Sequence, residues 1–226
     1  ELFDVDIDSK KIKRNMSNKM SGFCPSALLD HDGKLILSAT RYRSGENLFG
    51  ITVKVGDHDE EHIPSGGLNL TEAEIIETST DDLVAIMRNN DGRGGPAMRS
   101  MRKRNGEWTS PDPFFIPCCH RPTIKRLKDG RYFASWRFYP GCGTNQMTMM
   151  ALFPEHTLLA PRHAQQAIIR PLDFCGNVRA DQGYTGACQT DDGKMIVVNY
   201  MNQKSARTSL YSYVFGLDAF GYGELK

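Results

Sequence analysis

Residues 181–200 read DQGYTGACQTDDGKMIVVNY, and this stretch has the pattern of a β-hairpin. A segment containing Tyr184 leads into the pair Asp192-Gly193, and the run Met195-Ile196-Val197-Val198 follows. Asp-Gly between two such segments is a strong hairpin signal, because glycine adopts the positive φ angle that a tight two-residue turn requires. The β-branched residues after the turn favour an extended strand. The stretch therefore predicts two antiparallel strands.

The same pattern occurs three more times along the chain. With Asp192 as the reference residue, the matching positions are Asp32 in GFCPSALLDHDGKLILSAT, Asp129 in CCHRPTIKRLKDGRYFASWR and, more loosely, Asp82 in AEIIETSTDDLVAIMR. Leu83 follows Asp82 where glycine is expected, so a different turn is predicted in that copy. The repeat also predicts strands over residues 69–88, although LTEAEIIE contains helix formers.

The spacing of the four copies predicts a β-propeller. The reference aspartates lie 50, 47 and 63 residues apart. A period of about 40 to 50 residues with several strands per repeat is typical of propeller blades. We therefore expect an all-β fold, a β-propeller of four-stranded blades, with about five blades here or an incomplete six-bladed ring. The alternative is four unrelated hairpins in a β-sandwich.

Composition and charge exclude several classes of protein. The 226 residues include 28 Lys plus Arg and 27 Asp plus Glu, so no overall field favours nucleic acid or an acidic membrane. No apolar run approaches the roughly 18 residues of a membrane-spanning helix, and we expect no signal peptide within this sequence. The six cysteines show no CxxC spacing, so we predict free thiols and no metal site. We expect a single domain over residues 1–226 without a cofactor, and the sequence leaves the oligomeric state open.

Matched positions in the four copies carry charged or reactive side chains. The innermost strands of propeller blades run in the same direction, so equivalent positions surround one end of the central channel, where ligands bind. Eight residues before each reference aspartate lie Cys24, Glu74, Arg121 and Tyr184. At the far end of the following strands lie Arg41, Arg88, Arg137 and Tyr200. An apolar core does not require such side chains, so we predict that they line a binding site.

The order of these residues resembles the sialidase superfamily, in particular the bacterial BNR-repeat, sialidase-like propellers. The resemblance is carried by a glutamate followed 14 residues later by an arginine (Glu74 and Arg88), by Arg137 closing the next repeat, and by Gly183-Tyr184 opening the one after. The phrase D-x-G-Y before an Asp-Gly hairpin is also typical of that family. The resemblance covers residues 24–200.

This resemblance implies a retaining exo-glycosidase that cleaves a terminal acidic or decorated sugar and acts on a carbohydrate partner. In such enzymes a tyrosine attacks the anomeric carbon and a glutamate takes its proton, roles that fall on Tyr184 and Glu74. Arg88 and Arg137 would bind the sugar carboxylate through bidentate forks. The other expected substrate-binding residues are Arg121, His120 and Arg41. The family also favours a secreted or periplasmic location.

The sequence departs from the family pattern at two places. An Arg-x-Pro motif opens the family's first blade, and the corresponding place here is Cys24-Pro25. The acid/base aspartate has no clear counterpart, and Asp57, Asp59 and Glu46 are the candidates. Two alternatives therefore remain open. One is a catalytically silent glycan-binding propeller, and the other is a related propeller hydrolase or lyase that acts on a different sugar with His120 as its acid or base.

Overall fold

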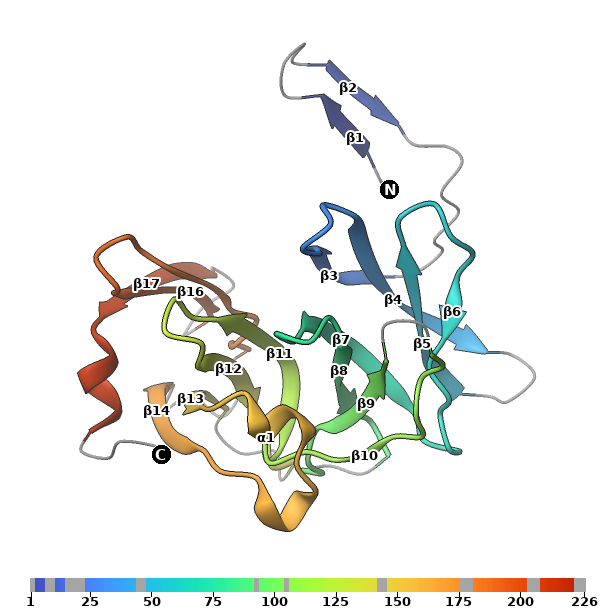
Figure 1. Cartoon of the computed structure of the whole chain (residues 1–226). Coiled ribbons are helices and arrows are strands. Elements are labelled where there is room, and N and C mark those ends of the chain that lie inside the picture. The colour runs from blue at the N-terminus through green and yellow to red at the C-terminus, as the bar shows by residue number, and fades with distance from the viewer. Residues whose placement is uncertain are drawn as a thin grey trace.

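The structure of the chain is a computed structural model. It describes residues 3–6, 11–14, 23–43, 48–91, 94–103, 106–141, 146–174, 181–202 and 208–221, with side chains from residue 26 onward except at residue 43. Within these ranges most elements are strands, and they form four antiparallel sheets and one separate hairpin (Figure 1). No helix in the described ranges is long and apolar enough to cross a membrane.

Each sheet is one blade and consists of consecutive strands. Blade 1 contains β3 (Phe23–Leu29), β4 (Leu35–Arg43), β5 (Leu48–Val55) and β6 (Glu61–His62). Blade 2 contains β7 (Leu70–Glu77), β8 (Leu83–Asn89), β9 (Met98–Arg102) and β10 (Asp112–Pro113). Blade 3 contains β11 (Cys119–Arg126), β12 (Tyr132–Phe138), β13 (Met147–Phe153) and β14 (Ile168–Phe174). Blade 4 contains β15 (Gly186–Gln189), β16 (Met195–Met201) and β17 (Ser209–Phe215).

The remaining elements are short. The strands β1 (Phe3–Asp6) and β2 (Lys11–Arg14) pair with each other. A one-turn helix, α1 (His156–Leu159), and a 3-10 helix over Arg162–Ala164 connect β13 to β14. A second 3-10 helix, Leu217–Phe220, follows β17.

The blades follow one another in chain order as in a β-propeller. The first strand of each blade is the inner one, and packing contacts join β3 to β7, β7 to β11 and β11 to β15. The prediction of an all-β propeller is therefore confirmed. The described residues form four blades, where the sequence predicted about five blades or an incomplete six-bladed ring.

The turn in blade 2 was placed two residues too late by the sequence comparison. In all four blades the inner hairpin closes with the same two backbone hydrogen bonds, and in blade 2 these join Thr78 to Asp82 and Asp81 to Thr78. Thr80 is therefore the counterpart of Asp32, and Asp81 occupies the position of Gly33, Gly130 and Gly193. Asp81 has a φ of 62°, in the left-handed region that those glycines also adopt. The turn is thus the same as in the other blades, and the predicted strands over residues 69–88 are confirmed as β7 and β8.

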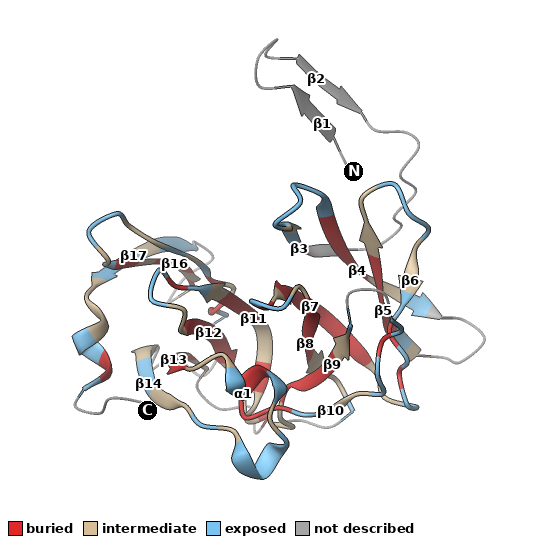
Figure 2. Ribbon diagram, viewed as in Figure 1, coloured by how far each residue is buried: buried red, intermediate tan, exposed pale blue. Residues whose placement is uncertain are grey.

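Three apolar clusters lie between neighbouring blades. Alternate residues of a strand point to opposite faces of the sheet, and both faces of an inner blade are covered. In β8, Leu83, Ala85 and Met87 belong to the cluster shared with blade 1, whereas Val84 and Ile86 belong to the cluster shared with blade 3. A third cluster joins blades 3 and 4. Figure 2 shows the buried residues concentrated in these strands.

Candidate active site

The centre of the site is a hydrogen bond between blades 2 and 4. The hydroxyl of Tyr184, just before β15, donates to Oε1 of Glu72 in β7. Glu72 is 8% exposed and Tyr184 is half-buried, so the pair lies in a partly desolvated place. Both residues lie eight positions before the reference residue of their blade once Thr80 is taken as the reference in blade 2. The geometry of the repeat therefore brings them to the same end of the inner strands.

Glu72 also accepts hydrogen bonds from one group in blade 2 and one group in blade 3. Its Oε2 accepts a hydrogen bond from Arg88 Nη1 at 3.2 Å and another from the backbone N–H of Arg121 at 3.0 Å. Its own backbone N–H donates to the hydroxyl of Thr40 in blade 1 at 3.0 Å. The carboxylate is therefore oriented by contacts with three blades, and Oε1 is directed at the tyrosine.

A local backbone irregularity places Glu72 in this position. The register of β7 with β8 shifts between Thr71 and Glu74, and Glu72 has a φ of 51°. The same shift occurs in β11 between His120 and Thr123, where Arg121 has a φ of 47°. Such bulges redirect a side chain relative to a regular strand, and they are common beside active sites. The repeated bulge thus turns Glu72 toward Tyr184 and brings the backbone N–H of Arg121 to Glu72.

Arg137 lies across the ring of Tyr184. Its guanidinium carbon is 4.6 Å from the centre of the ring, a distance suited to a cation–π contact. Arg137 is 8% exposed, and its Nη1 forms an ion pair with Asp181. Asp181 also accepts a hydrogen bond from the Tyr200 hydroxyl at 2.8 Å, and the Tyr200 ring meets the Tyr184 ring edge-on. These contacts fix the cation beside the phenol.

Gly183 makes room for Arg137. A Cβ atom at this position would lie 2.6 Å from the Cβ of Arg137, which is shorter than any ordinary contact. The residue also has a φ of 96°, a conformation that side chains other than glycine rarely adopt. The Gly-Tyr pair in the sequence therefore has a structural reason: the glycine lets the arginine approach the tyrosine.

His120 lies near the two arginines and packs edge-on against Tyr139. Burial, and then the charges of Arg88 and Arg137, lower the pKa of His120 to about 3. The imidazole is therefore neutral near pH 7. A group with so low a pKa is a poor proton donor or acceptor at that pH, which weighs against the alternative in which His120 acts as the acid or base.

Glu74 does not contact Tyr184, which corrects the predicted pairing. The side chain is 5% exposed and its Oε1 lies 3.3 Å from Lys125 Nζ. Burial raises the pKa of Glu74, against the lowering effect of Lys125 and Arg121. The prediction was wrong because Asp82, instead of Thr80, was taken as the reference residue of blade 2. Counting eight residues back from Asp82 gives Glu74, whereas counting back from Thr80 gives Glu72.

Arg41 lies outside the group around Tyr184. It pairs with Glu60 at 2.7 Å, whereas the register of β4 places Thr40 at the position of Arg88 and Arg137. A shift of one residue along a strand moves a side chain to the other face of the sheet. Of the predicted residues, the structure therefore brings together Tyr184, Arg88, Arg137 and His120, and Arg121 joins them through its backbone N–H. The side chain of Cys24 lies outside the described residues.

The candidate acid/base residues of the first blade lie elsewhere. Asp57 and Asp59 follow β5 and lie toward the end of blade 1 that carries the β3–β4 turn, and Asp59 lines a cavity there together with His31. Glu72 and Tyr184 lie toward the opposite end of the inner strands. Glu46 lies outside the described residues.

The arrangement has the chemistry of an activated tyrosine. Burial, the hydrogen bond to Glu72 and the charge of Glu72 raise the pKa of Tyr184, while Arg137 and Arg88 lower it. The phenol therefore keeps its proton near pH 7, and a carboxylate lies in position to accept that proton from the hydroxyl. The two arginines would stabilise the phenolate as it forms.

Comparisons with known proteins show the fold. No family model matches the chain, and no curated protein matches it. A protein of unknown function from Dyadobacter fermentans DSM 18053 superposes with a TM-score of 0.67 and 19% identity, over 84% of this chain and 52% of that one. The α-L-arabinanase of Penicillium chrysogenum, complexed with arabinobiose, superposes with a TM-score of 0.60 and 10% identity, over 85% of this chain and 62% of that one. The intramolecular trans-sialidase of Ruminococcus gnavus, complexed with oseltamivir carboxylate, superposes with a TM-score of 0.56 and 15% identity, over 86% of this chain and 43% of that one. The chain thus spans about half to three fifths of the length of the first two.

Proposed function

We propose that this protein is a retaining glycoside hydrolase in which Tyr184 is the nucleophile and Glu72 is its base. The observation that carries the proposal is the hydrogen bond from the Tyr184 hydroxyl to the carboxylate of Glu72, beside two arginines. The neighbouring structures that act on sugars include an arabinanase and a trans-sialidase, which is consistent with carbohydrate as the substrate.

In the proposed reaction the Tyr184 oxygen attacks the anomeric carbon while its proton passes to Glu72 Oε1. The bond to the leaving oxygen breaks as that oxygen takes a proton from the solvent, and an aryl glycoside of Tyr184 forms on the enzyme. Water then attacks the same carbon and loses a proton to the solvent, while the tyrosine oxygen departs and regains its own proton from Glu72. Retention of configuration follows from these two displacements.

A terminal acidic sugar is the substrate class that we propose. A neutral phenol avoids the repulsion that a carboxylate nucleophile would meet from an anionic sugar. The Nε atoms of Arg88 and Arg137 are buried and have no hydrogen-bond partner among the described residues. Buried donors of this kind favour an oxygen ligand, and guanidinium groups match a carboxylate in geometry.

The test compares aryl glycosides of sialic acid and of arabinofuranose with the wild-type chain and with Tyr184→Phe. We expect hydrolysis of the sialoside, and a loss of about 10²–10⁴-fold in kcat/KM for Tyr184→Phe. Mass spectrometry after a fluorinated sugar probe should find the sugar on the peptide that contains Tyr184. Equal turnover by both proteins, or labelling of another residue, would contradict the proposal.

A silent glycan-binding propeller is the second candidate. It is favoured by one observation: Asp57 and Asp59, the described candidates for the acid, lie at the opposite end of the blades from Tyr184. Binding of a sialoside or arabinoside by calorimetry, without turnover of either by the wild-type chain, would support this candidate over the hydrolase.

A further inference from the structure

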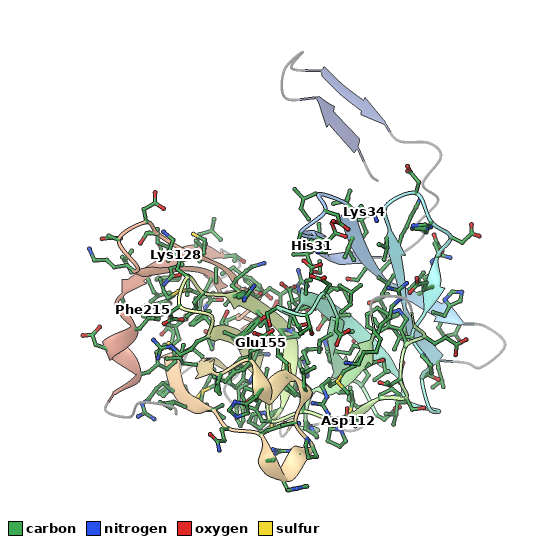
Figure 3. The ribbon with its side chains drawn as sticks, in the orientation of Figure 1. His31, Lys34, Asp112, Lys128, Glu155 and Phe215 are labelled. Carbon is green, nitrogen blue, oxygen red and sulfur yellow. The ribbon has the colours of Figure 1, made fainter. Side chains whose placement is uncertain are left out.

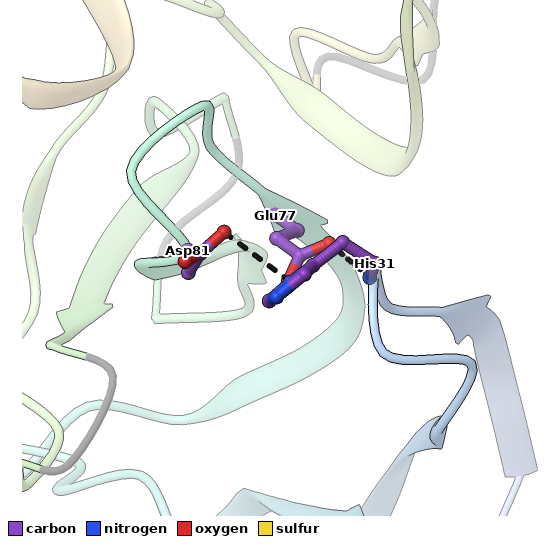
Figure 4. A group of neighbouring side chains, drawn as sticks. All are labelled: His31, Glu77 and Asp81. Carbon is purple, nitrogen blue, oxygen red and sulfur yellow. Dashed lines mark hydrogen bonds and ion pairs between the residues drawn. The ribbon is translucent and has the colours of Figure 1, made fainter.

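A second cluster of reactive side chains lies where the turns of blades 1 and 2 meet. His31 is in the β3–β4 turn, Glu77 ends β7, and Asp81 is in the β7–β8 turn (Figure 4). The three side chains point toward one another, and each offers a ligand atom within 4.8 Å of the others. Glu72 lies near the other end of β7, so this cluster is separate from the site around Tyr184.

The two distances from the His31 ring are close to those between ligands of a single metal ion. His31 Nδ1 lies 2.9 Å from Glu77 Oε1 and 3.2 Å from Asp81 Oδ1. Ligand atoms that share one ion at bonds of about 2.1 Å are separated by about 3.0 to 3.4 Å. The backbone N–H of His31 donates to the other oxygen of Glu77 at 2.9 Å and so directs Oε1 toward the imidazole.

Asp32 supplies the outer contact that a metal-binding histidine usually has. His31 Nε2 lies 3.1 Å from Asp32 Oδ1. Metal-ligating histidines almost always donate their second ring N–H to a carboxylate, a carbonyl or water, and this fixes the tautomer. With the proton on Nε2, the lone pair of Nδ1 faces two carboxylate oxygens. A cation between these three atoms satisfies all of them.

The equivalent junction between blades 3 and 4 shows what is unusual here. Lys128 takes the place of His31, and Gln189 and Gly193 take the places of Glu77 and Asp81. There the Lys128 backbone N–H donates to Gln189 and its ammonium pairs with Asp191 at 2.8 Å. His31 and Lys128 are both labelled in Figure 3.

The side chains that face each other at the two junctions also differ in charge. One lysine and one aspartate balance at the junction of blades 3 and 4. At the junction of blades 1 and 2, Glu77 and Asp81 replace uncharged residues, and His31 and Ser79 replace Lys128 and Asp191, so the three candidate ligands carry a charge of −2 when the imidazole is neutral. A cavity of about 480 Å³ opens beside the three ligands and is lined by further acidic groups, among them Asp30 and Asp59.

We propose that His31, Glu77 and Asp81 form a binding site for a divalent transition-metal ion, of which Zn²⁺ or Mn²⁺ fits best. An imidazole nitrogen with carboxylate oxygens suits these ions, whereas Ca²⁺ and Mg²⁺ prefer ligands that are all oxygen. The ion would tie the turns of blades 1 and 2 together. The cavity would leave coordination positions open to water.

Calorimetric titration of the chelator-treated chain with zinc chloride, manganese chloride and calcium chloride tests the site. We expect binding of one zinc or manganese ion per chain and a higher Tm in its presence. Asp81→Gly is the decisive variant, because the other three turns have glycine at this position and the fold tolerates it. It should abolish the one-site binding and the shift in Tm, and Asp32→Asn should weaken binding by about 10–100-fold.

Asp59→Asn is the matched control, because it removes an acidic group of the same cavity outside the three ligands. Its zinc affinity should equal that of the wild-type chain. The proposal is overturned if zinc and manganese leave Tm unchanged, if calcium alone binds, or if Asp81→Gly binds zinc as the wild-type chain does. A circular-dichroism spectrum and a metal-free melting curve of each variant verify that it is folded.

Discussion

Glu72 and Glu74 differ by two positions in sequence and have different surroundings. Glu72 accepts a hydrogen bond from the Tyr184 hydroxyl, whereas Glu74 accepts one from Lys125. We predict that Glu72→Gln lowers kcat/KM by about 10²–10⁴-fold, because an amide cannot take the proton. Glu74→Gln should lower it by less than tenfold. The ratio of kcat/KM for the two variants, measured on the substrate that the wild-type chain hydrolyses, decides which glutamate acts as the base for Tyr184.

His120 provides a prediction about pH. Its pKa is about 3 in the folded chain and about 6.5 in an unfolded chain, so the unfolded state binds a proton at a higher pH. The stability associated with the neutral imidazole is therefore present above pH 6.5 and is lost as the pH falls toward 3. The wild-type Tm should decrease more than that of His120→Gln between pH 7.5 and pH 4.5. Parallel decreases in the two proteins would show that His120 does not contribute.

The segment that leads into β15 depends on a glycine. We predict that Gly183→Ala destabilises the chain by at least about 1 kcal/mol, because alanine disfavours the positive φ and its Cβ would collide with Arg137. The shift of Arg137 should also raise the pKa of Tyr184 further, which an ultraviolet titration of the phenol near 295 nm can measure against Tyr184→Phe.

Gly186→Ala is the matched control for this element. It lies three residues further along, its φ is outside the positive region, and an added Cβ would have no neighbour within 4 Å. Its Tm and its phenol titration should stay close to those of the wild-type chain. An equal loss of stability in the two variants would mean that the contact with Arg137 is not the cause.

The hairpin turns show how far a sequence pattern defines an element. Asp-Gly marked the turns at Asp32, Asp129 and Asp192 correctly, because glycine supplies the required φ at low cost. In blade 2 the same position is Asp81, a residue that adopts this φ less readily. The missing glycine moved the predicted frame by two residues, although the strands themselves were predicted correctly.

The whole molecule is held together by clusters between neighbouring blades, so its stability should vary along the chain as in a repeat protein. Phe220 is 1% exposed in the cluster shared by blades 3 and 4, and its ring meets that of Phe133 at 6.2 Å. Phe220→Ala should cost about 3–5 kcal/mol. Hydrogen exchange should become faster in β16 than in the wild-type chain, with a smaller change in β4.

Leu210→Ala is the control for that prediction, since Leu210 is 78% exposed on blade 4. Its exchange pattern and Tm should remain close to those of the wild-type chain. A uniform increase in exchange across all four blades of Phe220→Ala would show that the blades unfold as one cooperative unit.

The sequence by itself determined the repeat, the strands and the end of the blades at which Tyr184, Arg88 and Arg137 would meet. It could do so because the alternation of residues, the turn glycines and the period of the repeat are local properties. The partner of Tyr184 and the cluster around His31 were decided only by the tertiary structure. A positive φ at Asp81, a bulge at Glu72 and a junction between two blades depend on contacts between residues distant in sequence. Those contacts make Glu72, and not the predicted Glu74, the hydrogen-bond partner of Tyr184.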